Sequence, residues 1–231
     1  MFSQAELFKG REVSPAKPTA PTRKECAVLN LYAGLGGNRK HWNAARVVAV
    51  ERQADIAEAY AEQYPQDEIV IGDAHEYLAE HHEEFDFIWS SPPCQTHSKM
   101  DFINVRNRPR FPDLKLYEEI IFLQAYAKGK WVVENVVPYY DSLVTPSAQV
   151  GRHLFWSNFF FAARDVTRPK DFIASSGQAT AGDLKAWLGL NFQGNIYYAG
   201  NHCPAQPLRN CVHPEIGRQI FEAALPAEVE G

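Results

Sequence analysis

Five short apolar runs, separated by helical or polar stretches, constrain the fold of this chain more than any other feature of its sequence. The runs lie at residues 27–32, 46–50, 69–71, 85–89 and 131–133. Alanine-rich or amphipathic stretches at 54–64 and 116–127 are typical of helices. Short buried strands that alternate with helices predict an α/β fold, in which a doubly wound, mostly parallel sheet carries helices on its faces.

The pattern changes after Gln149. Two aromatic runs at 153–156 and 158–161 predict strands, for which an antiparallel pairing is one arrangement, and the chain up to residue 208 is irregular apart from a helical stretch at 181–188. An amphipathic stretch at 214–224 predicts a final helix. We therefore expect three parts: an extended arm at 1–24, a main domain formed by 25–157 and 209–231, and a small region at 158–208.

Composition and charge limit the setting of the protein. Its 231 residues include four cysteines, too few for a disulfide framework, which favours a reducing compartment. No secretory leader and no run of membrane-spanning length is evident, so we expect a cytoplasmic protein without a membrane partner. The net charge of −5 does not indicate nucleic-acid binding, but local clusters matter more than the average. Two basic clusters stand out: Arg106, Arg108 and Arg110, and Arg164, Arg168 and Lys170.

Residues that suit a cofactor follow the first three apolar runs. These are the turn Tyr32-Ala33-Gly34-Leu35-Gly36-Gly37, then Glu51, then Gly72-Asp73-Ala74. The carboxyl ends of parallel strands meet at one edge of a sheet, where ligands bind. No phosphate-binding lysine follows the turn, which excludes a P-loop. The turn also lacks the G-x-G-x-x-G spacing of a dinucleotide-binding site. An adenosine-type cofactor without a pyrophosphate, S-adenosylmethionine, fits better, with Glu51 on the ribose hydroxyls and Asp73 near the adenine amine.

A cysteine and a glutamate follow the fourth and fifth runs. Cys94 ends Ser90-Ser91-Pro92-Pro93-Cys94, a turn that two prolines stiffen, and Glu134 opens Glu134-Asn135-Val136. A lone cysteine is often only a small buried hydrophobe. Here the thiol and the carboxylate are expected at the same sheet edge as Glu51 and Asp73, which favours a nucleophile with an acid–base partner.

Together these motifs resemble the DNA cytosine-C5 methyltransferase family, over most of residues 27–157 and again at about 209–224. The glycine turn is similar to the family's cofactor turn, and Pro93-Cys94-Gln95, followed by Ser98, to its nucleophile motif. Glu134-Asn135-Val136 resembles its glutamate motif, and Asn210-Cys211-Val212 its last motif. Four short motifs in family order are far more specific than any one of them.

The resemblance implies a class I S-adenosylmethionine-dependent fold and a role for each motif. The thiolate of Cys94 would add to C6 of a cytosine that has turned out of the DNA duplex, so that C5 can accept the methyl group. The implied catalytic residues are Cys94, Gln95, Glu134, Asn135, Arg152 and His153. The implied cofactor-binding residues are Tyr32, Gly34, Leu35, Gly36, Gly37, Glu51, Asp73, Ala74, Pro92, Leu116, Asn210 and Cys211. Those implied to contact nucleic acid are Ser98, Lys99, Arg106, Arg108, Arg110, Arg164, Arg168 and Lys170.

The sequence departs from the family pattern at two places. The family usually has Gln-x-Arg-x-Arg after its glutamate motif, but here Gly151 and His153 stand at the arginine positions, with Arg152 between them. Either Arg152 or His153 then contacts the flipped base, or the base is held differently. Arg209 replaces a usual glycine, which raises the alternative of a cofactor with an added carboxylate that an arginine could pair with.

The resemblance implies a monomer that acts on duplex DNA, as a restriction-modification or phage enzyme does, with residues 158–208 as a small target-recognition region. Several alternatives stay open: methylation of RNA such as tRNA, a non-catalytic cofactor-binding partner protein, and a thiol hydrolase that pairs Cys94 with His97 or His153. A metal site is the weakest reading and we expect none, because the spacing of His202, Cys203, Cys211 and His213 matches no common zinc pattern.

Overall fold

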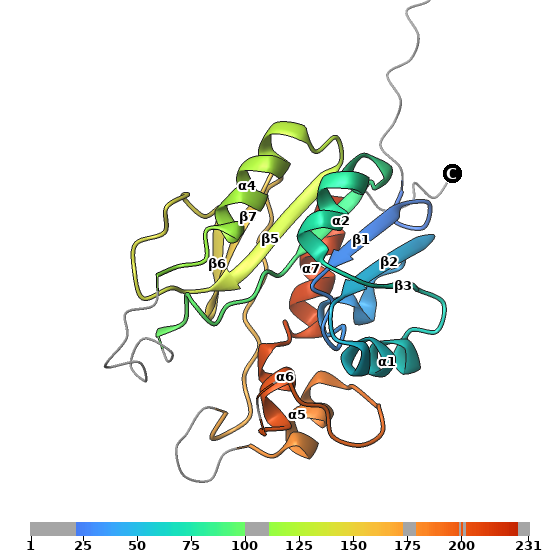
Figure 1. The fold of residues 1–231 in the computed structure, drawn as a ribbon, viewed down its shortest axis with the longest axis vertical. Helices are drawn as coiled ribbons and strands as arrows, with labels where there is room; N and C mark the ends of the chain where they lie inside the picture. The colour runs from blue at the N-terminus through green and yellow to red at the C-terminus, as the bar shows by residue number, and fades with distance from the viewer. Residues whose placement is uncertain (1–21, 100–110, 173–178, 199, 201, 226–231) are drawn as a thin grey trace, which may run out of the picture.

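The computed structural model describes residues 22–99, 111–172, 179–198, 200 and 202–225, and its centre is a seven-stranded sheet (Figure 1). The strand order is β3-β2-β1-β4-β5-β7-β6. The strands are β1 (Ala27–Leu31), β2 (Arg46–Glu51), β3 (Glu68–Ile71), β4 (Phe87–Ser90), β5 (Lys130–Val136), β6 (Ala148–Val150) and β7 (His153–Ser157). The first five are parallel, and β7 pairs antiparallel with both β5 and β6. The predicted α/β fold is confirmed. The predicted arm lies almost wholly outside the described residues.

The sheet reverses its strand order between β1 and β4. From β1 the chain moves outward to β2 and β3, then returns to the other side of β1 for β4 and β5. Such a switch point leaves a crevice beyond the carboxyl ends of the strands, because the helices that follow on either side diverge there. Each chemically suggestive motif from β1 to β5 therefore meets the others at this edge.

The prediction of a strand at 158–161 is wrong. The chain leaves the sheet after Ser157. The side chain of Asn158 then forms hydrogen bonds with the backbone at the start of β5. Its Oδ1 accepts from the Trp131 amide (3.0 Å) and its Nδ2 donates to the Gly129 carbonyl (2.9 Å). A side chain thus replaces the backbone pairing that would have extended β7. Burial still alternates, because Phe159 and Phe161 pack inward while Phe160 is exposed, and this alternation explains the strand-like pattern of the sequence.

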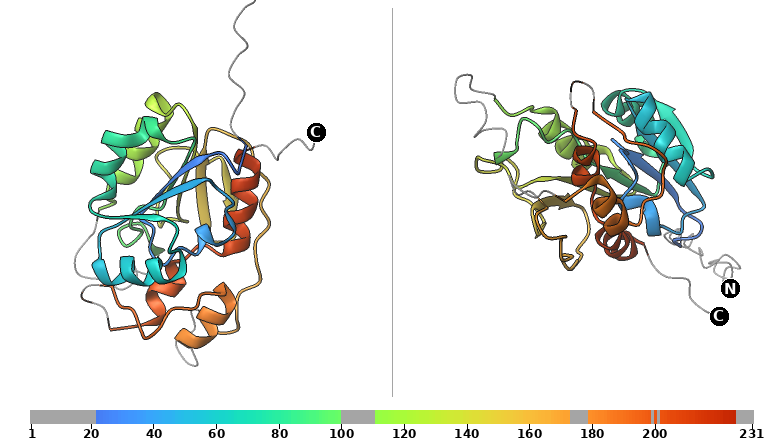
Figure 2. Two further views of the ribbon diagram at one scale, coloured as in Figure 1. Left: turned by 90° about the vertical axis from the view of Figure 1, so that its right-hand side faces the viewer. Right: turned by 90° about the horizontal axis from the view of Figure 1, so that it is seen from below.

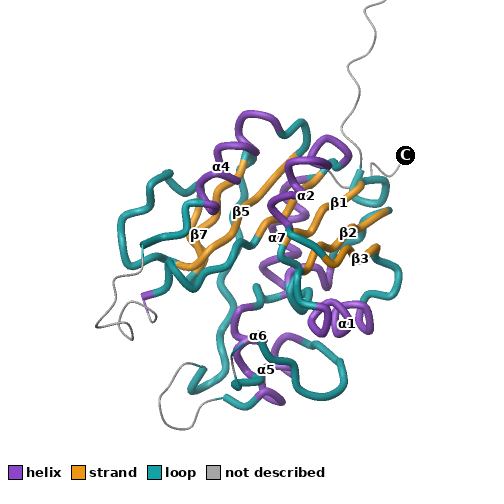
Figure 3. The backbone as a smooth tube through the Cα atoms, in the orientation of Figure 1, coloured by secondary structure: helices purple, strands orange, loops and turns teal. Residues whose placement is uncertain are grey.

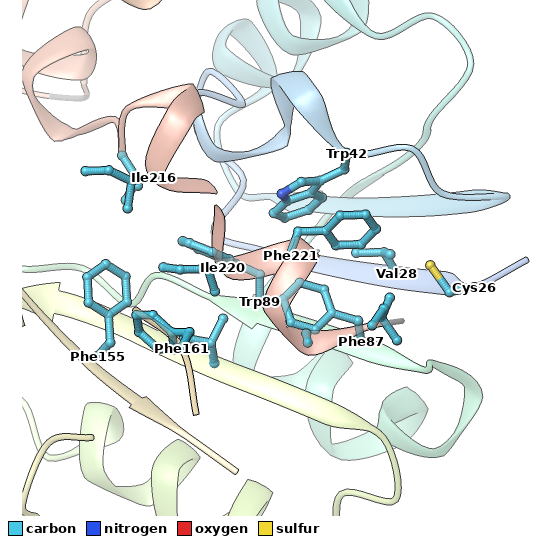
Figure 4. Close-up of a cluster of buried hydrophobic side chains, with 14 of the residues drawn as sticks. Cys26, Val28, Trp42, Phe87, Trp89, Phe155, Phe161, Ile216, Ile220 and Phe221 are labelled. Atoms are coloured by element: carbon cyan, nitrogen blue, oxygen red, sulfur yellow. The ribbon is translucent and has the colours of Figure 1, made fainter. Parts of the chain in front are cut away.

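One face of the sheet is covered by α7 (Pro214–Ala224) and the short helix η1 (Asn38–His41) (Figure 2). Aromatic side chains fill this layer (Figure 4). Trp42 stacks on Phe221 with ring centroids 5.6 Å apart, meets Phe87 edge-on, and donates from Nε1 to the Gly217 carbonyl. The last helix of the chain is thereby held against its first strands, which brings residues 210–212 to the crevice.

The opposite face is covered by α2 (Ala74–His81) and α4 (Lys115–Tyr126), which bury Leu78, Ile120 and Leu123 against β1, β4 and β5. The sequence did not predict α2. Its amino end is capped by Asp73, whose Oδ1 accepts from the amides of His75 and Glu76. On the face of α7 and η1, α1 (Ala54–Gln63) packs its Tyr60 against Ala49 of β2 and Ile69 of β3.

The small region lies below the carboxyl edge of the sheet and contains α5 (Ala181–Leu188) and α6 (Ala205–Asn210), joined mostly by loops (Figure 3). It is packed against the main domain. Leu184, Leu188 and Phe192 share a hydrophobic cluster with Leu35 of the glycine turn and Ile56 of α1. This region therefore forms one wall of the crevice.

A buried ion pair beside the glycine turn gives a stability prediction. Arg39 binds both carboxylate oxygens of Asp67 at 2.8 Å, and their side chains are only 6% and 1% exposed. Asp67→Asn leaves the guanidinium buried without its counter-charge, so we expect a loss of about 3–5 kcal/mol in the free energy of unfolding, measured by urea denaturation. Glu68→Gln, which removes the exposed partner of Arg46, should cost about 1 kcal/mol or less. Equal, small losses in both variants would contradict the prediction.

Candidate active site

A cavity of about 340 Å³ lies beyond the carboxyl ends of β1 to β5 and is lined by residues from every one of the predicted motifs. This volume is in the range of small-molecule sites. Most of the residues predicted to be catalytic or cofactor-binding line this cavity: Tyr32, Gly34, Leu35, Gly37, Glu51, Asp73, Ala74, Pro92, Cys94, Gln95, Leu116, Glu134, Asn135, Arg152, His153, Asn210 and Cys211.

The glycine turn is held in shape by close packing and by a buried carboxylate. A Cβ at Gly37 would lie 2.5 Å from the Val212 carbonyl oxygen, so only glycine lets the last motif approach the turn this closely. Tyr32 donates its hydroxyl to Glu119, a fully buried residue of α4. Glu119 also accepts from Ser90 Oγ at 2.6 Å and contacts His75 Nδ1 at 3.1 Å, which ties the loops after β1, β3 and β4 together.

The two acids expected to bind a cofactor both line the cavity and both accept backbone hydrogen bonds. Glu51 accepts from the Gly34 amide (3.0 Å) with Oε2 and from the Arg52 and Gln53 amides (2.8 and 2.9 Å) with Oε1. Burial would raise the pKa of the Asp73 carboxyl, but backbone hydrogen bonds at the start of α2 outweigh it and hold that pKa below its usual value. Both groups are therefore fixed hydrogen-bond acceptors at the cavity wall.

Cys94 sits half-buried at the cavity on the loop after β4. Asn135 of β5 anchors this loop by donating from Nδ2 to the Pro92 carbonyl at 2.9 Å. Burial and, secondarily, the negative charge of Glu134 raise the pKa of the Cys94 thiol to about 11, while the Arg152 guanidinium opposes the shift. The thiol is thus held in place but is protonated at neutral pH.

Glu134 is 6% exposed and hydrogen-bonds His153, which is equally buried, through Oε1 and Nδ1. Arg152 Nε donates to His153 Nε2 at 3.1 Å, and its Nη2 donates to the Arg209 carbonyl. Gly151 cannot be an arginine here without rearrangement. It lies in a left-handed turn (φ +57°), and a Cβ would meet Asp165 at 2.4 Å. The missing arginine thus follows from the tight turn between β6 and β7.

Several predicted residues lie away from the cavity. Gly36 does not line it, because this glycine faces Tyr60 and Tyr64. The Arg209 side chain is directed into the small region, toward the carbonyls of Phe172 and Ala179, so the carboxylated-cofactor alternative loses its premise. Ser98, Lys99, Arg164, Arg168 and Lys170 are also outside the cavity lining, and Arg106, Arg108 and Arg110 lie outside the described residues.

Other cavity residues were missed by sequence reasoning. Tyr198 comes from the irregular part of the small region and hydrogen-bonds Asn210, although no local pattern marks it. Asp113 and Lys115 lie at the start of α4. The sequence predicts a helix from residue 116, and that predicted start is the signal that could have identified them.

The thiol-hydrolase alternative needs a histidine on Cys94. His97 instead contacts the Tyr140 hydroxyl at 2.6 Å, and His153 contacts Glu134. In the described part of the chain, no group of three or more histidine, cysteine, aspartate or glutamate side chains is placed to hold a metal ion. No helix among the described residues has the length and apolar character needed to cross a membrane.

Comparisons with known proteins find a family match in sequence and similar solved structures. Residues 26–137, from β1 to the end of β5, match the model of the C-5 cytosine-specific DNA methylase family. The Entamoeba histolytica methyltransferase EhMeth has the same fold, with 12% identity and a TM-score of 0.52 over 87% of this chain and 98% of its own. The putative methylase HI0767 of Haemophilus influenzae matches with 16% identity and a TM-score of 0.41, over 58% of this chain and 86% of its own. The putative methyltransferase SMU.776, solved in complex with SAH, matches with 15% identity and a TM-score of 0.37, over 50% of this chain and 32% of its own. No curated protein matches.

The family match spans the glycine turn, Glu51, Asp73, Cys94 and Glu134, all of which the structure brings to one cavity. The helices and mixed sheet of the chain have the same fold as EhMeth. The match to the C-5 cytosine-specific DNA methylase family thus covers the part of the chain that holds the cofactor-side and thiol-side motifs, residues 26–137.

Proposed function

We propose that this protein transfers a methyl group from S-adenosylmethionine to C5 of a cytosine in duplex DNA, through a covalent bond between Cys94 and C6 of a base turned out of the helix. The observation that carries the proposal is a single cavity lined by both Cys94 and Glu134 and by both Glu51 and Asp73. A nucleophile beside a cofactor crevice provides the close approach that group transfer between two bound molecules requires.

The residues present fit this cofactor. Oε1 of Glu51 accepts two backbone amides and Oε2 accepts only one, so Oε2 keeps a lone pair that can accept from a ribose hydroxyl. Asp73 is a fixed acceptor for an adenine amine, and Gly37 lets the chain close over the crevice. When bound, the cofactor supplies an electrophilic sulfonium methyl group.

The chain's own residues supply the remaining chemistry. The Cys94 thiolate forms an Sγ–C6 bond and pushes electron density to C5, which then takes the methyl group. Glu134 would accept from the exocyclic amine, beside the ring nitrogen N3 on which charge develops. Loss of the C5 proton to a base breaks the Sγ–C6 bond, which restores both the ring and the thiolate. Pro92 and Asn135 keep the thiol aligned during these steps.

One observation favours RNA as a second candidate substrate. Two cationic side chains of the small region are engaged within the protein: Lys185 donates to the carbonyls of Phe192 and Gly194, and Arg168 pairs with Asp165. A region with few available cations suits a substrate whose base is already unstacked, as in a tRNA loop.

The test is to incubate the protein with radiolabelled S-adenosylmethionine and duplex DNA, single-stranded DNA or tRNA, beside Cys94→Ala. We expect label in duplex DNA, recovered as 5-methylcytosine by mass spectrometry, and none with the variant. Label in tRNA alone would overturn the DNA substrate, and no label in any polynucleotide would overturn the enzymatic proposal.

Glu51→Ala is expected to weaken S-adenosylmethionine binding about 10- to 100-fold, because the variant removes a charged acceptor for a ribose hydroxyl and frees the Gly34 amide. Isothermal titration calorimetry measures the change. Glu58→Ala, on the exposed face of α1, is the control and should bind as the wild type does. Equal affinities for the Glu51 variant and the wild type would contradict the assigned role.

A further inference from the structure

His153 stands where the family pattern has an arginine, and the sheet aligns it with Glu134. In the β5–β7 ladder, His153 lies opposite Val136, and Phe155 lies opposite Glu134. In an antiparallel ladder, a residue and the one two positions away from its direct partner project from the same face, within reach of long side chains. Glu134 and His153 are related in this way. This register brings His153 Nδ1 to Glu134 Oε1, and the ring also stacks on Phe155.

The contacts of His153 determine its tautomer. Arginine has only N–H donors, so its contact from Nε to His153 Nε2 (3.1 Å) requires a lone pair on Nε2. The proton of a neutral imidazole is then on Nδ1, which donates to Glu134 Oε1. Oε1 of Glu134 is therefore the acceptor of this bond, and His153 connects the Arg152 guanidinium to the Glu134 carboxyl group.

Arg152 is itself held from the small region. Its Nη2 donates to the Arg209 carbonyl, and its guanidinium lies over the Phe172 ring, 5.4 Å from the centroid. The charged and titratable groups that act on this assembly from neighbouring elements are Cys94, Arg168 and Cys211. Within the described residues, Glu134 Oε2 has no hydrogen-bond partner, so this oxygen is available at the cavity that Glu134 lines.

We propose that His153 is a positioning residue, which binds one oxygen of Glu134 through Nδ1–H and thereby presents the other oxygen, as an acceptor, to the amino group of a cytosine. This inference rests on the proposed function. An acceptor-only oxygen at this point favours cytosine, which has an amine at C4, over thymine or uracil, which have a carbonyl oxygen there. The arginine of the family pattern is replaced by a neutral ring with a cation behind it.

Nitrogen NMR of the protein labelled with ¹⁵N-histidine tests the tautomer without any substrate. We expect one resonance pair with a protonated Nδ1 and an unprotonated Nε2, absent from His153→Asn. Arg152→Met removes the donor at Nε2, so the Nε2 resonance should shift while Nδ1, which still faces Glu134, stays protonated. An Nε2–H ring or a doubly protonated ring at His153 in the wild type would overturn the proposal.

Kinetics test the positioning role. His153→Ala is expected to lower kcat about 100-fold with KM for the polynucleotide nearly unchanged, because a misplaced carboxylate costs rate rather than binding. His153→Asn places an amide N–H near the position of Nδ1–H and should recover most of that loss. Equal loss in both variants, with unchanged melting temperature and cofactor affinity, would overturn the role. His82→Asn, on the surface, is the control. A wild type without transferase activity would overturn the proposed function alone, since the nitrogen shifts still decide the tautomer.

Discussion

Cys94→Ala is expected to reduce methyl transfer by about 10⁴-fold or more, because the variant removes the atom that bonds to C6, and Cys211, the other thiol of the cavity lining, lies against Gly37 of the glycine turn. Cytosine C5 is a weak nucleophile until C6 carries a substituent, so the remaining positioning groups have little chemistry to accelerate. A filter-binding assay with radiolabelled S-adenosylmethionine measures the loss.

Two measurements separate this expectation from simple damage to the fold. A duplex with 5-fluorocytosine at the target should form a covalent complex with the wild type, which survives denaturing electrophoresis, because fluorine at C5 blocks the final elimination. Cys94→Ala should form none, yet it should bind S-adenosylmethionine as the wild type does. Cys203→Ala, which alters another half-buried thiol, should still form the complex. A trapped complex in the Cys94 variant would assign the nucleophile to another residue.

The sequence predicted most of the cavity because parallel-sheet geometry leaves few choices. Once residues 27–32, 46–50, 69–71, 85–89 and 131–133 are identified as parallel strands, the residues after each strand must share an edge. This rule alone groups four residues, without any knowledge of the loop structures: Glu51, Asp73, Cys94 and Glu134. The structure confirms this grouping by placing all four at the cavity.

The sequence could not predict contacts that depend on distant parts of the chain. Asn158 replaces a strand by binding the backbone of Gly129 and Trp131, and Tyr198 reaches the cavity from a segment without periodicity. The side chain of Arg209 was expected at the cofactor, but carbonyl groups of the small region bind it instead. Each of these outcomes is decided by hydrogen-bond partners that lie far away in sequence.

The reactivity of Cys94 is expected to rise about tenfold per pH unit from pH 7 to pH 10, close to 1,000-fold in all. Only the thiolate is nucleophilic, and burial together with the Glu134 carboxylate raises the pKa of the Cys94 thiol to about 11. Its ionised fraction therefore grows with pH across this whole range. The rate of alkylation by iodoacetamide, followed by mass spectrometry at Cys94, measures the trend without any assumption about the substrate.

Raised pKa values of two other cysteines set the highest pH at which that experiment is useful. Burial also raises the pKa values of Cys26 and Cys211, to about 11 and about 12, from an ordinary value near 9. An acid whose pKa is higher in the folded state than in the unfolded state supports folding fully below the unfolded value, and this support is lost as pH rises from about 9 through 11. Alkylation of Cys26 must therefore stay slow throughout the series, since its exposure would report unfolding. A Cys94 rate that levels off by pH 8, with Cys26 still protected, would show a thiol pKa below the ordinary value and would place a cation closer to Cys94 than Arg152 now lies.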